Sequence, residues 1–110
     1  MSKREKIAVI VKKPGEFPGK MKHVNNELKA FQEIVDGYLE VVPLRNGSDV
    51  IIVNEEGKIR DCKFNFTMLD FIDDQIFGTV IVAGVDKDGN MTEPSISLDE
   101  WARLLCDWGN

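Results

Sequence analysis

The stretch GYLEVVPLRNGSDVIIVNEEG, residues 37–57, decides the fold of this chain. Two apolar arms, YLEVVPL and DVIIV, flank the dipeptide Asn46-Gly47. Asn-Gly between β-branched runs is the strongest short-range signal for a β-hairpin, because both residues tolerate the positive φ of a tight turn. A turn centred on this pair places Val42 opposite Ile51 and leaves apolar side chains on both faces of the hairpin. Both faces therefore need a cover.

The two faces of the hairpin require different neighbours. We expect one face to meet two helices that begin near Asn26 and Ser97. The other face needs a lid, supplied either by the segment Ile59–Ile76 or by a second copy of the chain as a homodimer. Pro43 cannot donate a hydrogen bond to a neighbouring strand, which predicts that the end of the first arm is unpaired on one side. The space between this second face and its lid is where we expect a partner or ligand.

Length and composition indicate one globular unit. The chain has 110 residues, a length typical of one domain, and we expect residues 1–110 to form a single domain. Hydrophobic residues make up 43% and charged residues 30%, values that argue against a disordered or fibrous chain. The apolar runs are far shorter than the ~20 residues of a membrane span. No signal peptide is visible. We therefore expect a cytoplasmic protein with no membrane association.

Cysteine usage and net charge narrow the chemistry further. Cys62 and Cys106 show no CxxC spacing, so we expect reduced, buried thiols rather than a disulfide or a metal site. The formal net charge of −5 disfavours non-specific attraction to phosphate groups, although a local basic patch remains compatible with it.

Upstream of the hairpin, the pattern predicts two strands and a helix. The β-branched run 6–12 predicts a strand, and the loop PGEFPG leads to a short returning strand over 20–24 at a sheet edge. A helix follows, capped by Asn25 or Asn26 and stopped by Gly37. Its apolar stripe contains Leu28, Phe31, Ile34 and Val35.

Downstream of the hairpin, residues 59–76 give the weakest pattern. A short strand over 58–64 and a brief helix capped by Asn65 or Thr67 are expected there. Residues 77–86 form an almost unbroken apolar run, which predicts a central strand covered on both faces. Ser97 and Glu100 then make a capping box. The final helix carries a stripe of Leu98, Trp101, Leu104, Leu105 and Trp108.

These elements predict an α+β fold with a mixed or mainly antiparallel sheet of about five strands and two main helices, in the order β-β-α-β-β-(α)-β-α. The runs IAVIV, PGEFPG, NELKAFQEIVDG, YLEVVPL, VNEEGK and GTVIVAG resemble those of a family of small uncharacterised proteins from Gram-positive bacteria, their phages and mobile elements. The resemblance covers roughly the first 86 residues and leaves the last helix outside it. It implies a mobile-element setting and no established activity.

Catalytic signals are sparse. His23 is the single histidine, so a site built from several histidines is impossible. The run Asp86–Asn90 departs from the EF-hand calcium pattern and predicts a turn. No phosphate-binding glycine motif or zinc-protease motif is present. We therefore predict no catalytic residue, no metal site and no cofactor, and we favour a protein that is not an enzyme.

Non-catalytic binding is the favoured function, with a host protein or a small ligand as the partner. The candidate binding residues Asn54, Glu55, Arg60 and Asn65 follow the hairpin in sequence. The first alternative is a nucleotide-binding protein or enzyme that uses the Asn54–Asn65 region, with Arg60 facing an anion. The second is weak nucleic-acid binding through the Lys12–Lys22 loop. Nucleic acid is the less expected partner, because Phe17 is the single aromatic residue in that loop.

Overall fold

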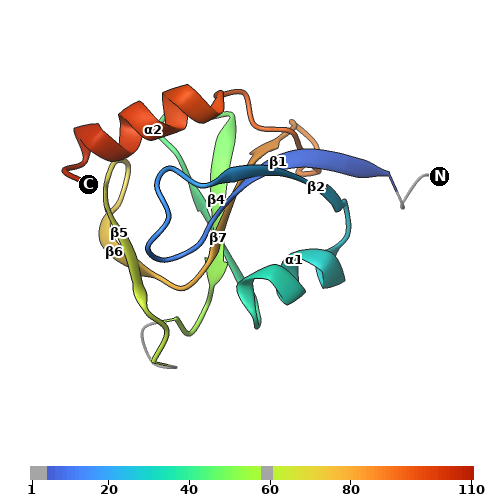
Figure 1. Ribbon diagram of the computed structural model, residues 1–110. Coiled ribbons are helices and arrows are strands. Elements are labelled where there is room, and N and C mark those ends of the chain that lie inside the picture. The colour runs from blue at the N-terminus through green and yellow to red at the C-terminus, as the bar shows by residue number, and fades with distance from the viewer. Residues whose placement is uncertain (1–4, 58–60) are drawn as a thin grey trace.

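The computed structural model describes residues 5–57 and 61–110, which form a six-stranded sheet, a two-stranded sheet and two helices (Figure 1). The large sheet contains β1 (Lys6–Lys12), β2 (Lys20–Asn25), β3 (Leu39–Pro43), β4 (Asp49–Asn54), β7 (Val80–Val85) and β8 (Met91–Thr92). The small sheet contains β5 (Phe64–Leu69) and β6 (Asp73–Phe77), and the helices are α1 (Leu28–Val35) and α2 (Leu98–Asp107). The predicted α+β class is confirmed, with more strands than expected and a second sheet.

The large sheet has the order β2-β1-β7-β4-β3, and β8 pairs with β7. Its strands pair in the antiparallel sense throughout the described residues. The apolar run after residue 77 forms the central strand β7, as predicted, and residues 20–25 form an edge strand. The run is shorter than expected, because Gly78 takes a positive φ of 84° and separates β6 from β7.

The hairpin β3–β4 has the predicted register. Val41 lies opposite Ile52 and Val42 lies opposite Ile51. The Leu44 N–H donates to the Asp49 carbonyl at 2.9 Å and closes the ladder before the turn. β3 is an edge strand, which accommodates the missing N–H of Pro43.

The two helices cover opposite faces of the sheet, so the prediction that both meet one face was wrong (Figure 1). Val50 and Ile52 pack in one core with α1, whose buried residues are Phe31 and Val35. The other core joins α2 to the opposite side of the hairpin and contains Val42, Ile51, Val53, Trp101 and Leu105. Each face of β4 is apolar, and one amphipathic helix presents too narrow a stripe to cover both faces.

The segment after β4 supplies the lid over the second face of the hairpin. It was one of the two expected covers, the other being a second copy of the chain. Its β5 and β6 strands, called the lid hairpin below, pack Phe66, Met68 and Ile76 into the same core as α2. The prediction of a brief helix here was wrong. Burial alternates from Phe66 to Leu69, with Met68 inside and Leu69 outside, which is the period of a strand rather than a helix. The strand expected over 58–64 lies partly outside the described residues.

The predicted N-terminal cap is wrong for α1 and right for α2. α1 begins at Leu28 after Glu27, which makes no side-chain capping bond, and the Asn26 amide instead donates to the Met91 carbonyl at 3.0 Å. The expected asparagine cap is therefore wrong. The capping box of α2 is confirmed, because the Ser97 hydroxyl accepts from the Glu100 N–H at 3.0 Å and the Glu100 carboxylate accepts from the Ser97 N–H at 2.7 Å.

Both cysteines are free thiols, but their expected burial is only partly right. Cys62 is half-buried and Cys106 is exposed. Cys106 follows the buried Leu105 on α2 and lies on the side of the helix turned away from the core. Among the described residues, no helix has the length and apolar character needed to cross a membrane.

The buried carboxylate of Asp49 gives a test of the hairpin's attachment. It is 1% exposed and accepts three hydrogen bonds, from the Ser95 N–H and hydroxyl at 2.7 Å each and from the Asn46 amide at 2.8 Å. Asp49→Ala should lower the free energy of unfolding by about 2–4 kcal/mol, because three donors lose their acceptor. Urea denaturation measures this loss. The exposed Glu33→Ala on α1 should change it by less than about 0.5 kcal/mol. Equal losses in the two variants would contradict the structural role of Asp49.

Candidate functional site

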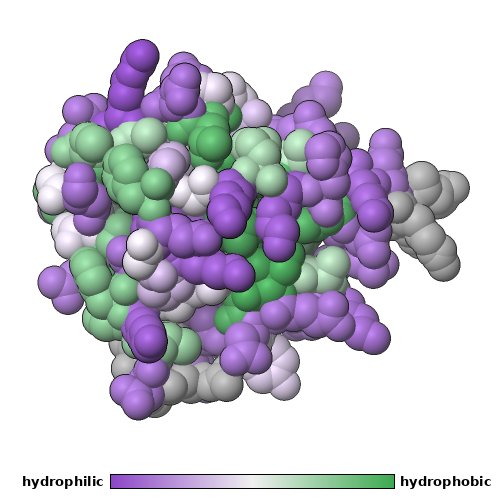
Figure 2. Space-filling model, in the orientation of Figure 1, coloured by the Kyte–Doolittle hydropathy of each residue, from purple (hydrophilic) through white to green (hydrophobic). Residues whose placement is uncertain are grey.

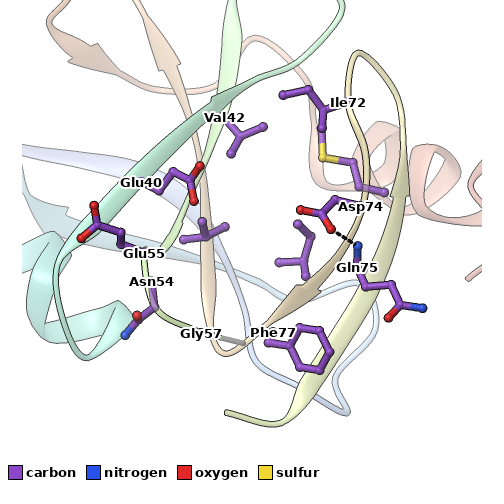
Figure 3. A pocket seen from close by; sticks show the side chains of 12 residues that line it. Glu40, Val42, Asn54, Glu55, Gly57, Ile72, Asp74, Gln75 and Phe77 are labelled. Carbon is purple, nitrogen blue, oxygen red and sulfur yellow. Dashed lines mark hydrogen bonds between the residues drawn. The ribbon is translucent and has the colours of Figure 1, made fainter. Parts of the chain in front are cut away.

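A cavity of about 250 Å³ lies between the second face of the hairpin and the lid hairpin, and we call it the cleft (Figure 3). Residues of β3, β4, the turn after β4 and β6 line it. Its floor is apolar and buried, and consists of Val42, Val53, Met68 and Ile76. Ile72, at the tip of the lid hairpin, also lines the cleft and is 46% exposed. The cleft is thus an opening into the edge of the core.

Carboxylates mark the rim of the cleft. Glu40 on β3 and Asp74 on β6 reach toward it from opposite walls, whereas Glu55 points outward (Figure 3). All three side chains are exposed. No Lys or Arg occurs among the described residues that line the cleft. The charged residues among the described lining of the cleft are therefore all acidic.

The outer edge of β6 also faces the cleft. Thr67 on β5 lies opposite Gln75 on β6. Asn110 binds both backbone groups of Thr67, accepting from its N–H at 2.9 Å and donating to its carbonyl at 2.7 Å. Because these groups point away from β6, Thr67 and Gln75 form the non-hydrogen-bonded type of antiparallel pair. The backbone groups of Gln75 therefore point away from β5, and its N–H donates to the Asp74 carboxylate at 2.8 Å.

One end of the cleft is closed where the backbone of the turn after β4 meets the backbone at the end of β6. A Cβ on Gly57 would lie 2.9 Å from the Phe77 carbonyl oxygen, which is closer than real Cβ contacts allow. The turn after β4 and the end of β6 can touch because Gly57 has no side chain. This contact fixes the distance between the two walls at that end.

Asn54, a predicted binding residue, lies in the wall of the cleft but uses its amide elsewhere. It is 5% exposed, and its Nδ2 donates to the carbonyls of Val35 and Asp36 at 3.1 and 3.0 Å. Its Oδ1 accepts from the Glu56 N–H at 2.7 Å. The Asn54 side chain thus satisfies the carbonyls at the end of α1 and joins that helix to β4.

The remaining predicted binding residues are dispersed. Glu55 lies on the rim of the cleft. Asn65 lies away from it, where its amide donates to the carbonyls of Lys12 and Gly78 at 2.9 and 2.7 Å. Arg60 lies outside the described residues. The structure therefore brings Asn54 and Glu55 together at the cleft and places Asn65 at the junction between β1 and the lid hairpin.

Glu40 and Asp74 were not among the predicted binding residues. A signal for Glu40 existed, because it interrupts the apolar side of the first hairpin arm. Asp74 belongs to the acidic pair Asp73-Asp74, a signal that was interpreted as the charged end of a helix. The cleft depends on pairing between segments that are distant in sequence.

Apolar side chains remain exposed around the lid hairpin. Figure 2 shows many hydrophilic side chains on the face seen in Figure 1, with apolar residues on the left, where β5 and β6 lie, and others at the top and just below the centre. The large exposed side chains of this part of the chain are Phe64, Leu69, Phe71 and Ile72. Of these, only Ile72 lines the cleft.

Acidic residues elsewhere form a turn rather than a coordination shell. The Asp86 carboxylate accepts from the N–H groups of Asp88 and Asn90 at 2.9 Å each. These bonds, chiefly the one from Asn90, hold the pKa of Asp86 below its ordinary value. The predicted turn is confirmed. Within residues 5–57 and 61–110, no group of three or more His, Cys, Asp or Glu residues is placed to hold a metal ion.

The Lys12–Lys22 loop holds fewer available cations than the sequence suggests. Lys12 is 3% exposed, and its ammonium donates to the Asn65 side-chain oxygen at 2.6 Å and lies 5.6 Å from the centre of the Phe66 ring. Lys20 is exposed and pairs with Glu16 at 3.8 Å. Nucleic-acid binding through this loop stays a prediction, without the Lys12 ammonium as a surface charge.

Comparison with known proteins gives one result. A family model described as Domain of unknown function (DUF3846) matches residues 6–105. The match reaches residue 105 of α2, so most of the last helix lies within the matched region and the shorter resemblance underestimated its extent. Comparison with curated proteins and with solved structures found no match.

The buried ammonium of Lys12 predicts a pH-dependent stability. Burial lowers its pKa below the ordinary value of 10.5, and the Glu16 carboxylate opposes this shift more weakly. Between the lowered pKa and 10.5, the unfolded chain binds more protons than the folded chain, so the Lys12 contribution to the free energy of unfolding rises with pH.

Lys12→Met removes this titration. We expect the free energy of unfolding of the unsubstituted protein to rise relative to that of Lys12→Met as the pH approaches 10.5. Urea denaturation of both proteins from pH 7 upward measures the difference. A difference that stays constant over this range would show that burial does not perturb Lys12.

Proposed function

The chain belongs to the family described as Domain of unknown function (DUF3846), and we propose that it is a small non-catalytic binding protein that holds a cationic ligand or partner group in the cleft. The observation that carries this proposal is the pairing of an apolar floor with two opposed carboxylates, Glu40 and Asp74. Such a site fits a positive charge on an apolar stem, as in an amine, a guanidinium compound or a Lys or Arg side chain.

The floor and the rim contribute in different ways. Contact with Val42, Val53 and Ile76 removes the apolar stem of the ligand from water, which supplies most of the binding free energy. The exposed carboxylates each contribute little to affinity, because solvent screens them. They select the sign of the ligand's charge and, with the net charge of −5, speed the approach of cations.

The setting of this binding is part of the proposal. The resemblance to proteins of phages and mobile elements of Gram-positive bacteria favours a host protein as the partner, met in the cytoplasm. The two free thiols are compatible with a reducing compartment. A host protein would present the cationic group as a surface Lys or Arg.

The nucleotide-binding alternative gains no support from the cleft. Phosphate groups would face Glu40 and Asp74 on its walls. The amides of Asn54 and Asn65 already bind backbone carbonyls. Binding through Arg60 stays a prediction.

Titration with simple probes tests the proposal. We expect agmatine, a short methylene chain with a guanidinium at one end and an ammonium at the other, to shift the amide NMR signals of Val42, Ile72 and Asp74 saturably, and ATP to leave them unchanged. Glu40→Gln and Asp74→Asn should each weaken agmatine binding by roughly two- to fivefold, in line with screened ion pairs.

Glu33→Gln is the matched control for these variants, because Glu33 is exposed on α1 and does not line the cleft. It removes the same formal charge and should leave agmatine binding nearly unchanged. Binding of ATP at the cleft, or equal effects of all three substitutions, would contradict the proposal.

A further inference from the structure

We propose that the occupant of the cleft is an extended, positively charged peptide segment of a partner protein, which adds as a strand to the outer edge of β6. This inference rests on the proposed function and specifies its ligand. Strand addition is a common mode of peptide recognition, in which backbone hydrogen bonds supply affinity and alternate side chains supply specificity.

The two outer edges of the small sheet differ in a way that favours strand addition at β6. The edge of β5 is occupied at Thr67, where the Asn110 amide donates and accepts as a neighbouring strand would. The edge of β6 is the one that borders the cleft, through Asp74, Gln75, Ile76 and Phe77. Consecutive residues of one strand line a cavity together when the edge of that strand, rather than one of its faces, borders it.

The Gln75 N–H is the donor that an incoming strand would use. It points away from β5 and now donates to the Asp74 carboxylate at 2.8 Å. A peptide carbonyl can replace the carboxylate as acceptor, so the N–H keeps one hydrogen bond throughout. The Asp74 carboxylate can then bind a Lys or Arg side chain of the peptide. The carboxylates of Glu40 and Asp74 on the walls of the cleft therefore favour a cationic peptide over an acidic one.

The opposite wall of the cleft gives the peptide its expected pattern. Side chains of a strand alternate between two faces. One set would contact the apolar floor at Val42 and Val53, and the other set would lie near the rim where Glu40 and Asp74 reach inward. We therefore expect apolar and basic residues to alternate in the bound segment.

The dimensions of the cleft favour a passing segment over an enclosed small molecule. Its volume of about 250 Å³ lies below the usual range of roughly 300–1,000 Å³ for small-molecule pockets. The rim residues Glu40, Ile72 and Gln75 are exposed, so a chain can enter and leave along the edge of β6. Only a few residues of the segment would lie inside the cleft.

Peptide titration tests the inference. Fluorescence anisotropy should detect binding of a labelled (Lys-Val)₄ peptide and no binding of (Glu-Val)₄ at equal concentration and salt. Gln75→Pro removes the N–H that faces the cleft and should weaken binding of (Lys-Val)₄ by roughly tenfold. Gln75→Ala keeps the N–H and removes a side chain that points away from the cleft, so it should bind as the unsubstituted protein does.

A second measurement keeps the test decisive if Gln75→Pro perturbs the lid hairpin. Two further versions of (Lys-Val)₄ are N-methylated, one on every Lys and the other on every Val. Each version has lost the N–H donors along one of its two hydrogen-bonding edges. We expect at least one of them to bind the unsubstituted protein roughly tenfold more weakly than the unmodified peptide. If both methylated peptides bind as tightly as the unmodified peptide, strand addition is overturned.

The outcomes separate this inference from the proposed function. Saturable agmatine binding at the cleft, together with (Lys-Val)₄ binding that is insensitive to Gln75→Pro and to N-methylation, would overturn the strand mode and leave the cationic cleft in place. Equal binding of (Glu-Val)₄ would also overturn it. Absence of binding by both agmatine and (Lys-Val)₄ would overturn both proposals.

Discussion

β4 and β7 lie side by side at the centre of the sheet with apolar side chains on both faces, and the rest of the structure depends on covering them. Two separate cores result, one under α1 and one under α2 and the lid hairpin. The two polar residues of β4 stand at its ends, and each is hydrogen-bonded toward a different cover. Asp49 binds Ser95, which precedes α2, and Asn54 binds the end of α1. One strand thus positions both covers.

Local signals predicted the parts of the fold that depend on neighbouring residues. The Asn46-Gly47 turn fixed the hairpin register, because its two arms adjoin in sequence. The apolar run of β7 indicated its central place, and the Ser97 capping box marked the start of α2. The assignment of each helix to a face could not be predicted, since it depends on packing between distant segments. The lid hairpin was missed because a short apolar cluster fits a helix or a strand equally well.

The position of the cleft could be predicted from the sequence, but the residues that line it could not. Because both faces of the hairpin are apolar, the sequence implied a second cover. The boundary between the second face and this cover was the expected place for a ligand. Asn54 and Asn65 were chosen as polar residues near a turn, but buried amides in such positions commonly satisfy backbone groups. Glu40 and Asp74 come from strands of different sheets, and only the completed fold sets them on opposite walls.

The contact of Gly57 with the Phe77 carbonyl has a consequence for how this family can diverge. The chain leaves β4 and returns from β6 at adjoining points, so the intervening segment is a cassette inserted into the sheet at a single place. Insertions whose ends lie close together can change length and sequence with little effect on the framework. Exchange of this cassette would alter one wall of the cleft and preserve the core under α1. Exchange would also replace Phe66, Met68 and Ile76, so partner choice is coupled to the core under α2 and independent of the core under α1.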